Sequence, residues 1–208
     1  MKTCLVIGNG PSLADMPLDF LRSYPTFASN RIYLLDGFNP TYYACVNPLV
    51  VEQSIKEINA LKCEEKYITS AWANKITGSI PLYSVGMRIF SHEPDRLIYE
   101  GFTVTYVLLQ LALWKGFTKV GLVGVDHHYR YEGNPNQECL ATGVDPNHFH
   151  PGYFSNGTRW NNPDLAESEA SYSMARRAFE QAGGQVVNIT PGSHLDVFER
   201  EDWKTWQK

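Results

Sequence analysis

The sequence contains no long hydrophobic run and no excess of positive charge. No apolar stretch reaches the roughly 18–20 residues that a membrane-spanning helix needs, so we expect no integral membrane segment. The 208 residues include 18 Lys and Arg against 22 Asp and Glu, which gives a formal net charge of -4 at pH 7. A chain without a basic field has little attraction for phosphate backbones, which argues against a nucleic acid as its partner.

Cysteines are few, and none of the four stands in the close pairs that are typical of metal sites. Cys4 and Cys45 lie inside apolar segments, which favours buried free thiols. The first apolar segment begins within a few residues of Met1, where a secretory leader would otherwise stand. We therefore expect a cytoplasmic protein.

What the sequence does contain is an alternation of strand-like and helix-like segments, in a composition that is 43% hydrophobic. We expect strands at 3–7, 25–28, 32–35, 42–46, 67–69, 120–123 and 186–189. We expect helices at 18–24, 49–61, 103–114 and 165–182, of which the third is apolar almost all round. This alternation predicts a mostly parallel sheet with helices on both faces, in a single Rossmann-like α/β domain over residues 1–208.

The periodicity disappears between residues 127 and 162. This segment is rich in Gly, Pro, Asn, His and aromatic residues, and it is far longer than an ordinary connection between two elements. We expect it to be an insertion that covers a functional site, and we call residues 127–162 the lid.

Polar turns follow several of the expected strands. In a parallel sheet the carboxyl ends of the strands lie at one edge, and ligands bind there. The turns at 8–12, 47–48, 124–128 and 190–193 should therefore meet. Their candidate ligand-binding residues are Gly8, Asn9, Gly10, Ser12, Asn47, Asp126, His128 and Ser193, together with Asn30 after the second strand.

The first turn, Gly8-Asn9-Gly10, allows the backbone to approach a phosphate or a sugar without a Cβ in the way. It is not the dinucleotide fingerprint, since Leu13 takes the place of the third glycine, and no lysine follows as in a P-loop. The alternative is a purely structural turn. The amides of Asn9, Asn30 and Asn47 suit a nucleotide's sugar and base edges, although asparagine also caps helices and forms turns.

The lid holds four of the six histidines: His127, His128, His148 and His150. A histidine can take a proton from a hydroxyl near neutral pH, and the tyrosines of the lid can donate to a leaving phosphate without a metal. One alternative is that the lid histidines only hold the loop together by hydrogen bonds. Another is a metal site formed by Asp126, His128, His148 and His150, although no helical histidine pair fixes its geometry.

Six segments together suggest a family. They are GNGPSL (8–13), SNRIYL (29–34), VNPLVVEQ (46–53), KGFTKVGLVGVD (115–126), the His- and Tyr-bearing lid, and NITPGSHLDVF (188–198). In this order and spacing, the chain resembles the bacterial sialyltransferases of glycosyltransferase family 42. It also resembles the wider group of 6-hydroxymethylpterin diphosphokinase-like domains (MptE-like) that share their core.

The resemblance implies a metal-independent, inverting transferase without a cofactor, which uses a nucleotide-sugar donor and a glycan acceptor. The donor is CMP-sialic acid in the best-known members. By the same resemblance Asn9, Asn30, Asn47 and Thr103 contact the nucleotide, Tyr129 and Tyr131 donate to the departing phosphate, and His148 is the general base, with His150 as the alternative. A homo-oligomer is suggested by the family and by no residue of the sequence itself.

Two other functions stay open at this point. A diphosphokinase would use ATP and Mg²⁺ on a small pterin-like alcohol, and it would need carboxylates and a cation such as Asp126, Asp145 and Arg130. A non-catalytic nucleotide-binding relative is supported by Val104-Thr105, which stand where the sialyltransferases have a small Ser-Gly step.

Overall fold

The computed structural model describes residues 1–207, and it is built on one large sheet. The strands of this sheet are β1 (Thr3–Ile7), β2 (Thr26–Ser29), β3 (Tyr42–Cys45), β4 (Glu65–Thr69), β5 (Ser79–Leu82), β8 (Lys119–Val123), β11 (Gln185–Asn188) and β12 (Glu199–Arg200). Their order is β12-β11-β8-β1-β2-β3-β4-β5, and every neighbouring pair is parallel. The predicted parallel α/β fold is confirmed.

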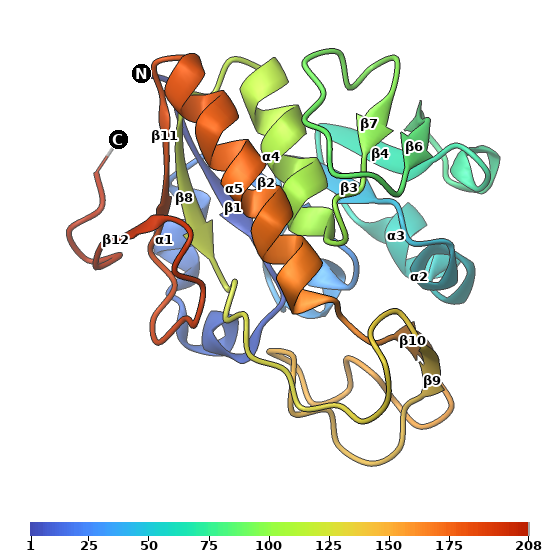
Figure 1. Cartoon of the computed structure of the whole chain (residues 1–208). Coiled ribbons are helices and arrows are strands. Elements are labelled where there is room, and N and C mark those ends of the chain that lie inside the picture. The colour runs from blue at the N-terminus through green and yellow to red at the C-terminus, as the bar shows by residue number, and fades with distance from the viewer. Residues whose placement is uncertain (208) are drawn as a thin grey trace.

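The sheet reverses its direction of growth between β1 and β8. From β1 the chain adds β2, β3, β4 and β5 on one side, and then crosses over to place β8 on the other side of β1 (Figure 1). In open α/β sheets such a switch point leaves a crevice outside the carboxyl ends of the strands. The turns that follow β1 and β8 border this crevice.

Helices cover both faces, as expected. They are α1 (Leu18–Arg22), α2 (Pro48–Gln53), α3 (Ile55–Ala60), α4 (Val104–Trp114) and α5 (Leu165–Gln181), with 3₁₀ helices at Pro11–Asp15, Ile32–Leu34 and Ala73–Lys75. Side chains alternate along β1, so that Cys4 and Val6 pack with α4 and α5, while Leu5 and Ile7 pack with α1, α2 and α3. Figure 1 shows α4 and α5 side by side across one face.

Two of the expected elements take another form in the structure, and the strands β5 and β12 of the large sheet were not expected. The helix expected over 49–61 is two short helices, because Ser54 leaves helical geometry at φ -138° and accepts a hydrogen bond from the Tyr33 hydroxyl (2.8 Å). The segment 32–35, expected to be extended, is a 3₁₀ turn instead. None of the helices in the described range is long and apolar enough to cross a membrane.

The lid lies beyond the carboxyl edge of the sheet and contains a small antiparallel hairpin, β9 (Glu138–Leu140) and β10 (Arg159–Asn161) (Figure 1). A second small sheet pairs β6 (Ser84–Val85) with β7 (Ile98–Tyr99). The Gln53 amide exchanges two hydrogen bonds of 3.0 Å with the backbone of Arg159. The backbone N–H of Phe149 also donates to the Asn9 carbonyl (3.0 Å). The lid is thus held against both α2 and the turn after β1.

Candidate functional site

A cavity of about 540 Å³ lies at the switch point, between the carboxyl ends of the strands and the lid. Ten of the fourteen predicted site residues line it: Gly8, Asn9, Gly10, Asn30, Asn47, Thr103, Asp126, His128, Tyr129 and His148. The remaining four lie outside its lining: Ser12, Tyr131, His150 and Ser193. Residues that are up to 140 positions apart in the sequence thus share one site.

The glycines of the first turn make room for the turn after β8. A Cβ on Gly8 would lie 2.4 Å from the Gly124 carbonyl oxygen, and a Cβ on Gly10 would lie 1.9 Å from Asp126 Oδ2. The N–H groups of Gly8 and Gly10 donate to the carbonyls of Val123 and Gly124, both at 2.8 Å. The two turns lie so close together that only glycine fits at positions 8 and 10. This agrees with the alternative that the turn is structural.

Asp126 is tied to the same turn. Its carboxylate accepts hydrogen bonds from Ser12 Oγ (2.8 Å) and from the Ser12 N–H (3.0 Å). Burial raises the pKa of Asp126 above its ordinary value, and the hydrogen bonds from Ser12 act in the opposite direction. Ser12 thus holds the turns after β1 and β8 together.

The three predicted asparagines line the cavity, and each also has a structural contact. Asn47 caps α2, since its side-chain oxygen accepts from the Leu49 N–H (2.9 Å). Asn30 adopts a left-handed backbone (φ 51°), and its Oδ1 accepts a hydrogen bond from the Cys45 thiol (3.6 Å). Asn9 donates weakly to the Ser29 carbonyl (3.3 Å), and its Oδ1 is buried without a hydrogen-bond partner within residues 1–207. A donor group on a ligand would satisfy this oxygen.

His148 belongs to a buried histidine–carboxylate pair. Its Nδ1 lies 2.7 Å from Asp145 Oδ2, and the two side chains are 10% and 2% exposed. The imidazole stacks flat on the Tyr153 ring, with a centroid distance of 3.8 Å and an interplanar angle of 2°. A carboxylate at Nδ1 holds the proton on that nitrogen and leaves Nε2 free to accept one. The arrangement is typical of a general base.

His150 is placed differently. Its Nδ1 accepts a hydrogen bond from the Gly152 N–H (3.1 Å) of its own turn, and its side chain does not reach the cavity. The structure therefore separates the two histidines that the sequence left as alternatives.

Three tyrosines line the cavity: Tyr129, Tyr153 and Tyr172. Burial raises the pKa of each of them above its ordinary value, so their hydroxyls stay protonated and are able to donate hydrogen bonds. Of the predicted tyrosine pair only Tyr129 is among them.

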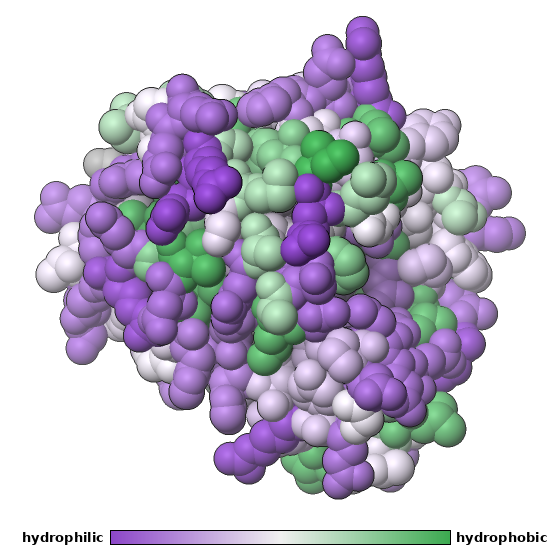
Figure 2. Space-filling model, viewed as in Figure 1, coloured by the Kyte–Doolittle hydropathy of each residue, from purple (hydrophilic) through white to green (hydrophobic). Residues whose placement is uncertain are grey.

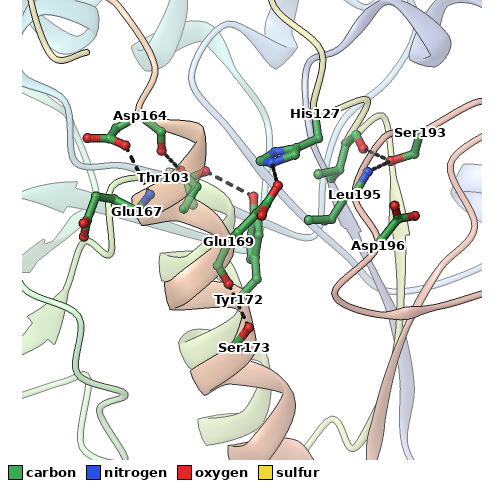
Figure 3. A network of polar contacts seen from close by, with 12 residues as sticks. Thr103, His127, Asp164, Glu167, Glu169, Tyr172, Ser173, Ser193, Leu195 and Asp196 are labelled. Carbon is green, nitrogen blue, oxygen red and sulfur yellow. Dashed lines mark hydrogen bonds and ion pairs between the residues drawn. The ribbon is translucent and has the colours of Figure 1, made fainter.

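The start of α4, the first half of α5 and His127 also line the cavity. Figure 3 shows the polar contacts that join them. Thr103 caps α4 and shares a 3.3 Å hydrogen bond with the Tyr172 hydroxyl. His127 has a left-handed backbone (φ 54°), and its Nε2 lies 3.0 Å from Glu169 Oε1. A non-glycine residue in this conformation is uncommon and is often found at functional sites.

Ser193 has a structural place beside this part of the cavity (Figure 3). Its hydroxyl donates to the Val125 carbonyl (2.7 Å) and accepts from the Leu195 N–H (3.1 Å) and from Asn188 Nδ2 (2.9 Å). These bonds fasten the turn after β11 to the end of β8. Ser193 supports the edge of the site without lining the cavity.

The cavity has little positive charge. Arg159 is the single lysine or arginine among the described residues that line it, and it is paired with Glu52 and, at 3.9 Å, with Glu138. No three His, Cys, Asp or Glu residues between Met1 and Gln207 are grouped so that they could hold a metal ion. The metal-site alternative built on Asp126, His128, His148 and His150 is therefore not formed in the structure.

Sequence reasoning missed Tyr153 and Tyr172 as parts of the site. It named His127 only among the lid histidines, and Asp145 only as a carboxylate of the alternative diphosphokinase. The spacing of Asp145 and His148, three positions apart, was the one local signal. The stacking of Tyr153 and the contact of Tyr172 with Thr103 depend on the folded lid and on the packing of α5 against α4.

The sequence matches no protein-family model and no curated protein. Solved structures do match. A MAf glycosyltransferase from Magnetospirillum magneticum AMB-1 aligns with 99% of this chain at 13% identity and a TM-score of 0.64. This chain spans about a third (34%) of that protein's length. The sialyltransferase CstII from Campylobacter jejuni, in complex with CMP-3FNeuAc, aligns with 96% of this chain and 86% of its own at 15% identity, with a TM-score of 0.51.

The chain has the fold of these glycosyltransferases. The resemblance to bacterial sialyltransferases is thus confirmed for the fold. The resemblance to the diphosphokinase-like domains stays a prediction.

Proposed function

We propose that the chain is a metal-independent, inverting glycosyltransferase that uses a nucleotide-sugar donor, of the CMP-linked class, and a glycan acceptor. The observation that carries the proposal is the buried His148–Asp145 pair on the wall of the switch-point cavity. The fold shared with a sialyltransferase and a MAf glycosyltransferase supports it.

In the proposed reaction His148 Nε2 takes the proton of the acceptor hydroxyl while the acceptor oxygen attacks the anomeric carbon. The bond from that carbon to the phosphate oxygen breaks, and its electron pair leaves with the nucleotide phosphate. Asp145 stabilises the imidazolium that forms, and the flat contact with the Tyr153 ring adds a favourable cation–π interaction. The imidazolium then loses its proton to solvent.

The departing phosphate needs hydrogen-bond donors where its charge develops. Tyr129 lines the cavity and keeps its proton, because burial raises the pKa of its hydroxyl. We assign Tyr129 to the phosphate. Asn9, Asn30 and Asn47 then serve the nucleoside, and the unpaired Oδ1 of Asn9 accepts from it.

A nucleotide panel tests the donor class. Thermal unfolding is measured with CMP, CDP, UDP and ATP, with and without Mg²⁺. A ligand at 100 times its dissociation constant stabilises by about 2.7 kcal/mol, which corresponds to a rise in Tm of roughly 5–11 °C for a chain of this size. We expect CMP to give this rise without Mg²⁺. A response to ATP that requires Mg²⁺ would instead support the diphosphokinase function.

A pair of variants tests the base. His148→Ala should abolish transfer while the Tm rise with CMP persists. His150→Ala is the matched control, because it removes an imidazole of the same lid that lies outside the cavity. If His150→Ala abolishes transfer and His148→Ala does not, the assignment of the base is wrong.

A further inference from the structure

The lid carries a second cavity of about 300 Å³, which is open to solvent and which the proposed reaction does not use. Every residue that lines it lies between Arg130 and Asn162, within the lid itself. Its walls are the β9–β10 hairpin and the loop that leads to His148. This cavity is therefore a feature of the insertion and not of the sheet.

The second cavity adjoins the first. Four residues line both: Asn147, Phe154, Trp160 and Asn162. Asp145 lines the second cavity and holds Nδ1 of His148, which lines the first. A molecule bound in the second cavity would therefore lie beside the carboxylate that orients the proposed base.

The frame of the second cavity is already formed. The Asn147 amide accepts from the Arg130 N–H (2.7 Å) and donates to the Arg130 carbonyl (2.9 Å). Asn162 Nδ2 donates to the carbonyls of Glu132 (2.7 Å) and Asn134 (3.0 Å). Because these buried amides are satisfied within the lid, they shape the cavity and leave recognition to other side chains.

Those other side chains offer an aromatic floor and a charged rim. Phe154 and Trp160 lie with ring centroids 5.2 Å apart at 35°. The side chains of Arg130 and Glu132 are exposed and have no hydrogen-bond or ion-pair partner in the described part of the chain. Leu140 adds an apolar edge that is 65% exposed. Figure 2 shows such hydrophobic residues at the outer end of the lid, within a mostly hydrophilic surface.

We propose that the second cavity is an acceptor subsite that binds one pyranose ring of a glycan, next to the sugar whose hydroxyl is glycosylated. A pyranose has an apolar C–H face, which packs on an aromatic ring such as Trp160, and a rim of hydroxyls, which suits Arg130 and Glu132. The cavity of about 300 Å³ has room for one ring, which would lie across the shared side chains from the sugar at His148. This inference rests on the proposed function.

Saturation-transfer NMR on the full chain tests the subsite with lactose, N-acetyllactosamine, chitobiose and maltose as probes. We expect at least one of them to bind, and Trp160→Ala to weaken that binding about tenfold or more. Arg130→Ala should weaken it too, and this exposed side chain has no partner whose loss would disturb the fold. The matched control is Trp114→Ala, which removes a 41% exposed tryptophan outside both cavities and should leave binding unchanged.

The nucleotide panel separates the two proposals. If CMP stabilises the chain and no probe sugar gives a signal that depends on Trp160 or Arg130, the subsite is refuted and the transferase proposal stands. If a probe sugar gives such a signal and no nucleotide stabilises the chain, the lid binds a carbohydrate and the proposed transfer is refuted. The subsite is also overturned if the control Trp114→Ala weakens sugar binding as much as Trp160→Ala does.

Discussion

Replacing Gly8 with alanine should destabilise the protein far more than an ordinary substitution in a turn. The new Cβ would lie 2.4 Å from the Gly124 carbonyl oxygen and 3.0 Å from its carbon, and both belong to the backbone. Ordinary contact begins at 3.4 Å, so the turns after β1 and β8 would have to separate by about 1 Å.

The size of the effect follows from what this separation breaks. The hydrogen bonds that Gly8 and Gly10 donate at 2.8 Å would lengthen beyond useful range. Two lost backbone bonds at about 1 kcal/mol each, with the strain of overpacking, give about 3 kcal/mol. For a chain of this length that is a fall in Tm of roughly 6–12 °C.

Gly86→Ala is the matched control. No atom lies within 4 Å of the Cβ that it would add, and its backbone is not left-handed. The variant should be neutral or more stable by about 0.4–1 kcal/mol, since alanine restricts the unfolded chain. Thermal unfolding of the three proteins by circular dichroism is the assay. A Gly8→Ala protein that melts within about 2 °C of the wild type has lost no more than about 1 kcal/mol, and that result would refute the reasoning.

Three further predictions concern titratable groups. Asp145→Asn should move the His148 proton to Nε2, because the new amide can donate to Nδ1. ¹H–¹⁵N spectra should show this change of tautomer. Transfer should fall about 100-fold or more, while CMP binding persists. Burial raises the pKa of the Asp126 carboxyl in the folded state above its value in the unfolded chain. The stability that this carboxyl contributes is therefore fully present below its pKa in the unfolded state, and it is lost as the pH rises through its pKa in the folded state. In denaturant unfolding between about pH 4 and pH 7, Asp126→Asn should become more stable relative to the wild type as the pH rises. Burial raises the pKa of Cys45 to about 12, and Cys4 is buried as well. Neither thiol should therefore react with a thiol reagent near pH 8 until the protein unfolds. Mass spectrometry of the treated protein measures the modification.

The central strands β1, β2, β3, β8 and β11 could be predicted because they are short apolar segments followed by turn residues. The edge strands β5 (Ser79–Leu82) and β12 (Glu199–Arg200) were not predicted. The edge where the turns of the central strands meet followed from parallel order alone. The break at Ser54 could not be predicted, since the residues on either side of it keep helical spacing. At the break Ser54 accepts a hydrogen bond from Tyr33, a residue 21 positions away that the local pattern does not reveal.

The site was predictable in its residue types and less so in their partners. His148 stood out as a lid histidine, yet its stacking on Tyr153 depends on an irregular backbone that no periodicity describes. Ser12 and Asp126 were both predicted to contact the nucleotide. They contact each other across 114 positions of sequence, which only the pairing of β1 with β8 brings about.

The position of β1 in the middle of the sheet has a consequence for how the chain folds during synthesis. Thr3 leaves the ribosome well before Lys119, where the partner of β1 on one side, β8, begins. At typical elongation rates this strand waits on the order of ten seconds with one edge unpaired. Non-local pairing of this kind slows folding and exposes a strand edge to other chains. Expression at lower temperature, or with a chaperone that shields this edge, should therefore raise the soluble yield.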